Sequence, residues 1–162
     1  MPTAKAKATA PTTKSAPTEA TAILRADHKL VSDLFAEVEK TRKPDKKQLL
    51  VEQICQELTI HATVEEEIFY PAVKKALKDD ELVPEALVEH ASLKALIAEL
   101  EGAEGDDEMY DAHVKVLSEY VKHHVKEEQN EMFPKVKETD LDLVDLGAQI
   151  LKRKEELKAE LA

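Results

Sequence analysis

A histidine pattern that occurs twice constrains the fold of this chain more than any other feature. The segments that begin at His61 and at His124 share a Glu four positions later and a Pro ten positions later. A further His, preceded by an acidic residue, lies 33 positions before the first segment and 34 before the second, at His28 and His90. Because residues four apart lie on one face of a helix, the pattern predicts a metal site built twice, once in each half of a helical bundle.

The composition is that of a helical, acidic protein. The 162 residues include three glycines, 4% aromatic and 35% charged residues, which suits one helical domain. A net charge of −11 argues against nucleic acid and anionic membranes as partners, since both need basic surfaces. No apolar run reaches the roughly 18 residues that a membrane span needs. The single cysteine, Cys55, excludes an intramolecular disulfide and fits a reducing compartment, so we expect a cytoplasmic protein.

Hydrophobic periodicity predicts an all-α protein, an up-down-up-down four-helix bundle. A disordered tail rich in Ala, Thr, Pro and Lys, the bundle, and an additional C-terminal amphipathic helix are expected at residues 1–18, 19–137 and 138–162. The bundle helices are expected near residues 18–41, 46–78, 84–102 and from 106 onward. Pro71 and Pro134 should kink the second and fourth helices. The last helix should pack across the bundle or against another subunit, which gives a monomer or a homo-oligomer.

Four histidines fall on the apolar stripes of the four predicted helices. On the second and fourth helices a glutamate one turn later shares the face of the histidine. Such groups are costly to bury without a partner, and a metal ion is the usual partner. Mixed nitrogen and oxygen ligands with two carboxylates able to bridge suit a dinuclear iron centre, with manganese or zinc as competitors. The predicted metal ligands are His28, His61, Glu65, His90, His124 and Glu128.

The fourth helix offers a second His-x-x-x-Glu pair, His123 with Glu127, shifted by one residue. His124 keeps the ten-residue spacing to the proline, and it shares a face with Leu117 and Val121. We therefore assign the buried position to His124 and expect His123 to be solvated.

Several blocks of the sequence together resemble the hemerythrin-like (HHE cation-binding) family over roughly residues 20–137. These blocks are Asp27-His28, His61-x-x-x-Glu65 with Phe69-Tyr70-Pro71, Glu89-His90, and His124-x-x-x-Glu128 with Met132-Phe133-Pro134. The resemblance implies a bundle with two iron ions bridged by an oxo or hydroxo oxygen and by both glutamates. It also implies two histidines for each iron: His28 and His61 for one, His90 and His124 for the other.

One position departs from the oxygen-carrying members of this family. These members have a fifth His one turn after the ligand of the third helix, and Lys94 stands there in this chain. Four imidazoles, two bridging carboxylates and one bridging oxygen fill about ten of the twelve positions on two octahedral metals, whereas five imidazoles fill about eleven. The resemblance therefore implies a more open centre, which favours reaction with oxygen, peroxide, nitric oxide or incoming iron over oxygen storage.

Three further residues are candidates for a supporting role beside the metals. Tyr120 lies one turn before His124 and is expected to face inward, Glu57 takes the matching position before His61, and Lys94 faces either the centre or the solvent. Three functions remain open. The protein is a di-iron module that binds or senses small oxidants or iron in sensing or stress protection, an enzyme that consumes peroxide or oxidises ferrous iron, or a metal-free interaction module.

Overall fold

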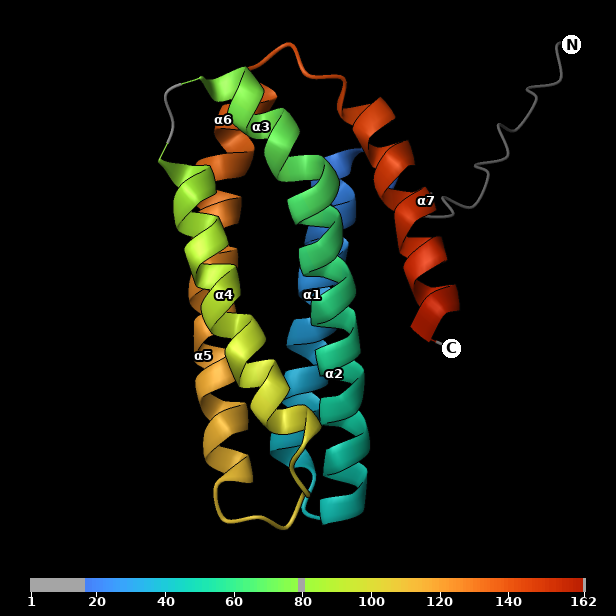
Figure 1. The fold of residues 1–162 in the computed structure, drawn as a ribbon, viewed down its shortest axis with the longest axis vertical. Helices are drawn as coiled ribbons and strands as arrows, with labels where there is room; N and C mark the ends of the chain where they lie inside the picture. The colour runs from blue at the N-terminus through green and yellow to red at the C-terminus, as the bar shows by residue number, and fades with distance from the viewer. Residues whose placement is uncertain (1–16, 79–80, 162) are drawn as a thin grey trace, which may run out of the picture.

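The computed structural model describes residues 17–78 and 81–161. Four long helices run alternately up and down the molecule, as the hydrophobic pattern predicts (Figure 1). Within the described residues the fold is all-α, without a strand. The bundle helices are α1 (Ala20–Lys40), α2 (Pro44–Val64), α4 (Leu82–Glu101) and α5 (Tyr110–Glu127). The last of them begins four residues later than expected, because turns occupy the loop after Gly102. Except for residues 17 and 18, the predicted tail lies outside the described residues.

Two of the helices are extended by a wide π-helical turn. The chain passes from α2 through η1 (Glu65–Phe69) into α3 (Tyr70–Leu77), and from α5 through η2 (Glu128–Met132) into α6 (Phe133–Lys137). In each case the first N–H after the π turn donates to the carbonyl five residues earlier, that of Glu65 or Glu128. A proline is the second residue of each following helix, where its missing N–H leaves one helical bond unmade. The predicted kinks therefore take the form of π turns.

The apolar core is divided into two clusters by a layer of polar side chains. The first cluster lies toward the α1–α2 and α4–α5 loops and includes Phe35, Ile54 and Leu117. The second lies toward α3 and α6 and includes Leu24 and Phe69. The helices α1, α2 and α4 contribute to both clusters, whereas α5 contributes to the first and its continuation through η2 and α6 to the second. Each of the four helices carries a buried histidine between the clusters. The bundle thus places four imidazoles at one height.

A further helix, α7 (Leu143–Leu161), packs on the outside of the bundle against α1 and α2 (Figure 1). Leu146 and Ile150 are its buried apolar contacts. Gly147 allows the close approach, since a Cβ at this position would lie 2.1 Å from the backbone oxygen of Thr18. The amphipathic C-terminal segment therefore covers its own bundle. Assembly with another subunit stays a prediction.

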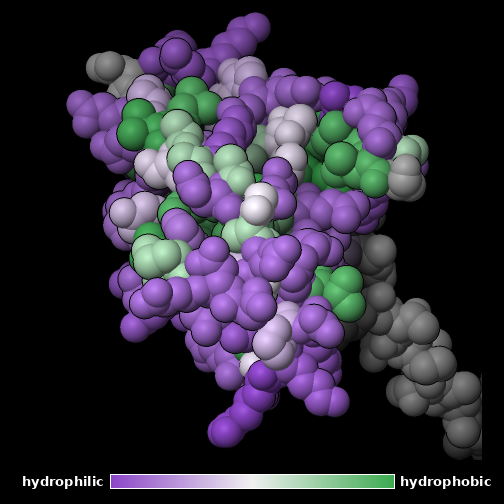
Figure 2. All heavy atoms as spheres, turned by 60° about the horizontal axis from the view of Figure 1, so that its bottom comes forward, coloured by the Kyte–Doolittle hydropathy of each residue, from purple (hydrophilic) through white to green (hydrophobic). Residues whose placement is uncertain are grey.

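The face drawn in Figure 2 is largely hydrophilic, and hydrophobic side chains appear on it as separate patches. In the described part of the chain no helix is both long and apolar enough to cross a membrane.

Candidate metal centre

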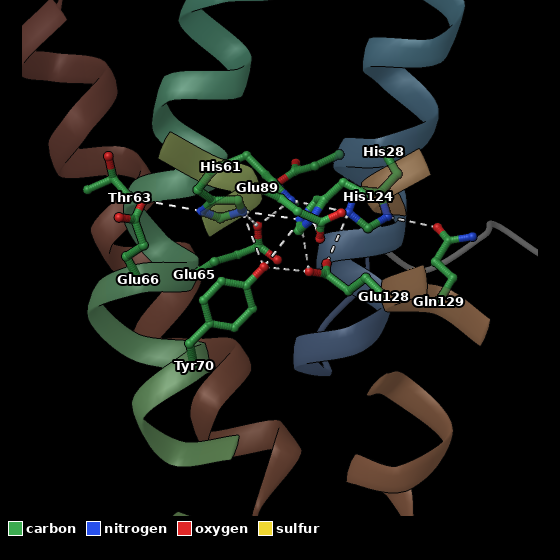
Figure 3. Close-up of polar contacts among 12 residues, drawn as sticks. His28, His61, Thr63, Glu65, Glu66, Tyr70, Glu89, His124, Glu128 and Gln129 are labelled. Carbon is green, nitrogen blue, oxygen red and sulfur yellow. Dashed lines mark hydrogen bonds and ion pairs between the residues drawn. The ribbon is translucent and has the colours of Figure 1, made fainter. Parts of the chain in front are cut away.

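The polar layer between the two core clusters consists of four imidazoles and two carboxylates whose side chains point toward one another (Figure 3). All six are buried. They come from α1, α2, α4 and α5 and from the first residues of the two π turns. The structure thus brings together every ligand that the sequence predicts: His28, His61, Glu65, His90, His124 and Glu128.

The first half of the layer joins α1 to α2 and to the second π turn. The Nε2 atoms of His28 and His61 lie 3.2 Å apart. His28 Nε2 is 3.3 Å from Glu128 Oε1, and His61 Nε2 is 3.0 Å from Glu65 Oε1. Four donor atoms from four different segments therefore converge on one point.

The second half repeats this arrangement between α4 and α5. The Nε2 atoms of His90 and His124 also lie 3.2 Å apart. His90 Nε2 is 3.3 Å from Glu65 Oε1, and His124 Nε2 is 3.3 Å from Glu128 Oε2. Each glutamate thus contacts histidines of both halves. A carboxylate placed in this way would be able to contact a cation held by either pair of histidines.

The Nδ1 atoms of the four histidines point away from this centre, toward oxygen atoms on other segments. For the histidines of α2 and α5, the partner is the acidic residue that precedes the histidine of α1 or α4 in the sequence. His61 Nδ1 donates to Asp27 at 2.9 Å, and His124 Nδ1 donates to Glu89 at 3.0 Å. Because a carboxylate only accepts, the proton sits on Nδ1 and the Nε2 lone pair faces the centre.

The other two histidines are held by the residue that follows each bridging glutamate. His28 Nδ1 lies 2.8 Å from Gln129 Oε1, and His90 Nδ1 lies 3.3 Å from Glu66 Oε2. The duplication therefore extends beyond the ligands to the groups that orient them. No role was expected for Gln129 or Glu66, although their place directly after Glu128 and Glu65 is a repeated signal.

The chemistry of this donor set fits a pair of metal ions. Three buried carboxylate oxygens, Glu65 Oε1, Glu65 Oε2 and Glu128 Oε1, accept no hydrogen bond within the described residues as long as the Nε2 atoms that face them carry no proton. Leaving such an atom unsatisfied costs about 1–3 kcal/mol or more. Imidazole lone pairs that face one another within 3.2 Å need a cation between them for the same reason. Nitrogen and carboxylate ligands without thiolate suit iron, manganese or zinc.

Without metal, protons take the place of the cations. Burial by itself lowers the pKa of His124, but hydrogen bonding to Glu128 and the nearby carboxylate charges outweigh it and raise the pKa to about 9. Burial likewise opposes protonation of His61, yet the charges of Glu65 and Asp27 hold its pKa well above the usual range. Burial alone would raise the pKa of Glu128. Hydrogen bonds from His124 and His28 outweigh burial and bring this pKa well below its usual range.

A tyrosine hydroxyl also reaches the centre. Tyr70 Oη donates to Glu128 Oε2 at 2.6 Å and lies 3.2 Å from His90 Nε2 and 3.3 Å from His124 Nε2. Burial and the two glutamate charges raise its pKa well above 10, so the phenol keeps its proton. With α-helical spacing, Phe69 rather than Tyr70 would follow Glu65 on the same face, four residues later. The π turn adds one residue, which rotates Tyr70 toward the centre.

The corresponding residue of the other half is Phe133, which follows the second π turn. Its ring is stacked with that of His28 at a centroid distance of 6.1 Å. Because phenylalanine has no hydroxyl, the two halves of the centre differ at this position. The hydroxyl lies only beside the His90 and His124 half.

The structure corrects two of the supporting roles expected from the sequence. The side chain of Tyr120 is not inward but 50% exposed. A step of four residues rotates by about 400°, so Tyr120 lies roughly 40° round the helix from His124, away from the buried stripe. Glu57 is half-buried, and the carboxylate that holds His61 is Asp27 of the neighbouring helix.

The remaining expectations concern Lys94 and His123. The Lys94 side chain is 54% exposed, and its Nζ lies 2.7 Å from Glu66 Oε1, so it reaches the centre only through the carboxylate that contacts His90. His123 is 64% exposed, as expected, and contacts Glu89 and Glu127 at 3.4 and 3.3 Å.

A cavity of about 250 Å³ adjoins the four histidines on the side of the first core cluster. Lys94 and Thr63 line it together with aliphatic side chains, namely Val31, Leu58, Leu93, Ile97, Val121 and Val125. Position 94, where the oxygen-carrying family members have a fifth histidine, holds a lysine whose side chain turns to Glu66. The cavity gives small uncharged molecules a place next to the centre.

Comparison with known proteins agrees with this geometry. Residues 19–136 match the family model described as the hemerythrin HHE cation-binding domain. A crystal structure of a hemerythrin HHE cation-binding domain-containing protein from Mycobacterium kansasii has the same fold, with a TM-score of 0.76 over 89% of this chain and 90% of that chain, at 24% identity. A DNA nickase of Nostoc sp. (strain PCC 7120) is 29% identical over 115 residues, 71% of this chain. The chain spans only 32% of the length of that relative.

Proposed function

Because the chain belongs to the hemerythrin HHE cation-binding family, we propose that it is a non-haem di-iron protein that binds or reacts with small oxidants, namely oxygen, peroxide or nitric oxide, or with iron itself. The single observation that carries the proposal is the buried set of four imidazoles and two carboxylates beside an apolar cavity. A role in sensing or in protection against oxidative stress fits such a centre.

Each residue of the centre has a distinct task in this proposal. One ion would be held by His28, His61 and both glutamates, and the other by His90, His124 and the same glutamates, which matches the convergence of their Nε2 and carboxylate atoms. Two iron ions would supply Lewis acidity and electrons to a small ligand. The cavity gives that ligand space beside the histidines, and aliphatic side chains form much of its lining.

The second candidate function is an enzyme at the same centre, one that consumes peroxide or oxidises ferrous iron. The observation that favours it is the protonated hydroxyl of Tyr70, which lies against Glu128, His90 and His124. A buried phenol at this position can deliver a proton to a reacting oxygen atom. Steady oxygen release from peroxide, or ferrous oxidation far beyond two irons per chain, would select the enzyme. A stable and reversible colour change with oxygen would select the binding protein or sensor.

The match with a DNA nickase does not lead us to propose nicking activity. It concerns a third of that protein, and the present chain has a net charge of −11, which opposes contact with phosphate backbones.

The proposal is tested by the metal content of the purified protein and of three variants. We expect about two irons per chain after expression with iron, together with the near-ultraviolet absorption typical of a di-iron(III) centre. His61→Ala and Glu128→Ala each remove a buried ligand and should lose most of the metal. His123→Ala is the matched control, since His123 belongs to the alternative His-x-x-x-Glu pair and is exposed; it should keep the metal.

Two outcomes would contradict the proposal. Metal-free wild-type protein after iron-replete expression would exclude both the binding protein and the enzyme. Loss of metal in His123→Ala with retention in His61→Ala would place the site elsewhere on α5.

A further inference from the structure

The C-terminal helix contacts the centre although it lies outside the residues that match the family model. Lys154 of α7 makes a close ion pair with Oδ1 of Asp27, while the other oxygen of Asp27 accepts the hydrogen bond from His61 Nδ1. The side chains of Lys154 and Asp27 are only 12% and 11% exposed. A continuous chain of contacts therefore runs from α7 to a predicted metal ligand.

The other half of the centre contains a similar arrangement, with a histidine in the place of the lysine. Glu89 accepts from His124 Nδ1 with Oε1, and its Oε2 lies 3.4 Å from His123 Nε2. Both acids thus use one oxygen for a buried imidazole and the other for a basic side chain. In the second half that side chain is solvated and belongs to the bundle, whereas in the first half it is only 12% exposed and comes from α7.

A fixed ammonium group constrains a carboxylate in two ways. Its charge compensates the burial of Asp27, which would otherwise be costly. Its position also fixes the plane of the carboxylate, so that Oδ2 faces His61 Nδ1. A carboxylate that accepts a hydrogen bond in this way sets the orientation and tautomer of a metal-binding imidazole.

We propose that Lys154 is a positioning residue of the metal centre, which makes α7 part of the metal-binding unit. Acting through Asp27, it keeps His61 Nε2 directed at Glu65. The inference rests on the proposed metal-binding function but concerns only how one ligand is held.

The test is the metal affinity of the full-length chain, measured by competition of Co²⁺ with a chromophoric chelator. Lys154→Met should weaken binding about 10- to 100-fold, the effect of removing a group that orients a ligand. Lys154→Arg, which retains the charge, should recover most of the affinity. The matched control is Arg153→Met, because Arg153 on the same helix pairs with the exposed Glu67 at 2.8 Å and has no contact with a ligand histidine.

A double-mutant cycle separates positioning from a purely structural role. In an Asp27→Asn background, Lys154→Met should cause no further loss of affinity, because its action passes through the carboxylate. If Lys154→Met fails to fold, as judged by thermal unfolding of the metal-free chain, Lys154→Gln replaces it in the same cycle.

The outcomes are distinguishable from failure of the proposed function. Wild-type protein that binds no Co²⁺ and no iron would refute the metal site itself. Wild-type binding together with equal affinities for Lys154→Met and Arg153→Met would refute only the role of Lys154. The same holds if Lys154→Met costs as much affinity in the Asp27→Asn background as in the wild type.

Discussion

Each of the four buried histidines is held by a residue from another segment of the chain. Asp27 of α1 orients His61 of α2, and Glu89 of α4 orients His124 of α5. Asp27 and Glu89 therefore accept a hydrogen bond from the histidine of a neighbouring helix and not from the histidine that follows them in the sequence. This exchange ties the helices together in pairs and explains why an acidic residue precedes a histidine in both halves.

The raised pKa of His124 predicts that both the metal affinity and the stability of the metal-free protein depend on pH. In the metal-free protein this pKa is about 9, above its ordinary 6.5, and the proton must leave before a metal can bind. Metal affinity should therefore rise with pH between 6.5 and about 9. The stability that His124 contributes to the metal-free fold has the opposite sign: it is fully present below pH 6.5 and is lost as pH rises through about 9.

Chelator competition, with the chelator calibrated at each pH, measures the first effect. Urea unfolding of the metal-free chain at the same pH values measures the second. An affinity that stays constant or falls across this window would contradict the assignment of His124 as a ligand that protons occupy when metal is absent.

At the level of elements, the two π turns decide which side chains follow the bridging glutamates into the centre. Each turn holds one residue more than an α-helical turn, so the register shifts by one position after Glu65 and after Glu128. Tyr70 and Phe133 thereby occupy equivalent places, and only one of them carries a hydroxyl. The docking of α7 is a second feature of the elements that shapes the surroundings of the centre, because it brings Lys154 to Asp27.

The close contact at Gly147 predicts the effect of a single methyl group. In Gly147→Ala the new Cβ would meet the Thr18 carbonyl oxygen at 2.1 Å, so α7 must move away from the start of α1. Overpacking of this kind costs about 1–3 kcal/mol, and thermal unfolding should show a Tm lower by several degrees.

Gly102→Ala is the matched control for this change, since a Cβ at Gly102 meets no atom within 4 Å. It should leave the Tm nearly unchanged. Equal Tm values for the two variants would mean that α7 does not dock at Gly147.

At the level of the whole molecule, a polar layer separates two apolar clusters. The unsatisfied oxygens of Glu65 and Glu128 lie in this layer, in the middle of the bundle. Folding therefore buries charged groups that only protons or metal ions can compensate. The metal-binding site and the stability of the fold are coupled for this reason.

Metal should accordingly raise the thermal stability of the entire bundle. A ligand that binds only the folded state stabilises it by about 2.7 kcal/mol at a free concentration one hundred times its Kd. For a chain of this size that corresponds to a rise in Tm of roughly 5–10 °C. Differential scanning calorimetry of the metal-free and Co²⁺-loaded protein measures it, with Glu128→Ala as the control that should show little shift. A wild-type Tm independent of metal would contradict the coupling.

The sequence by itself determined the helical class and the set of side chains that meet in the polar layer. These depend on local periodicity: a His and a Glu four residues apart share a helix face wherever the helix packs, and the duplication marks both halves. The exposed position of His123 followed from the same reasoning, since Leu117 and Val121 mark the buried face of α5.

Only the tertiary structure decided which groups surround those ligands. Hydrogen bonds from Nδ1 cross between helices, so His61 pairs with Asp27 rather than with Glu57 of its own helix. The π turn breaks the α-helical register on which the prediction relied, which brings Tyr70 inward, whereas Tyr120 stays at the surface. The contact of Lys154 requires α7 to dock on a particular side of the bundle. Periodicity along one helix contains no information about the angle at which another helix approaches, and those angles decided these contacts.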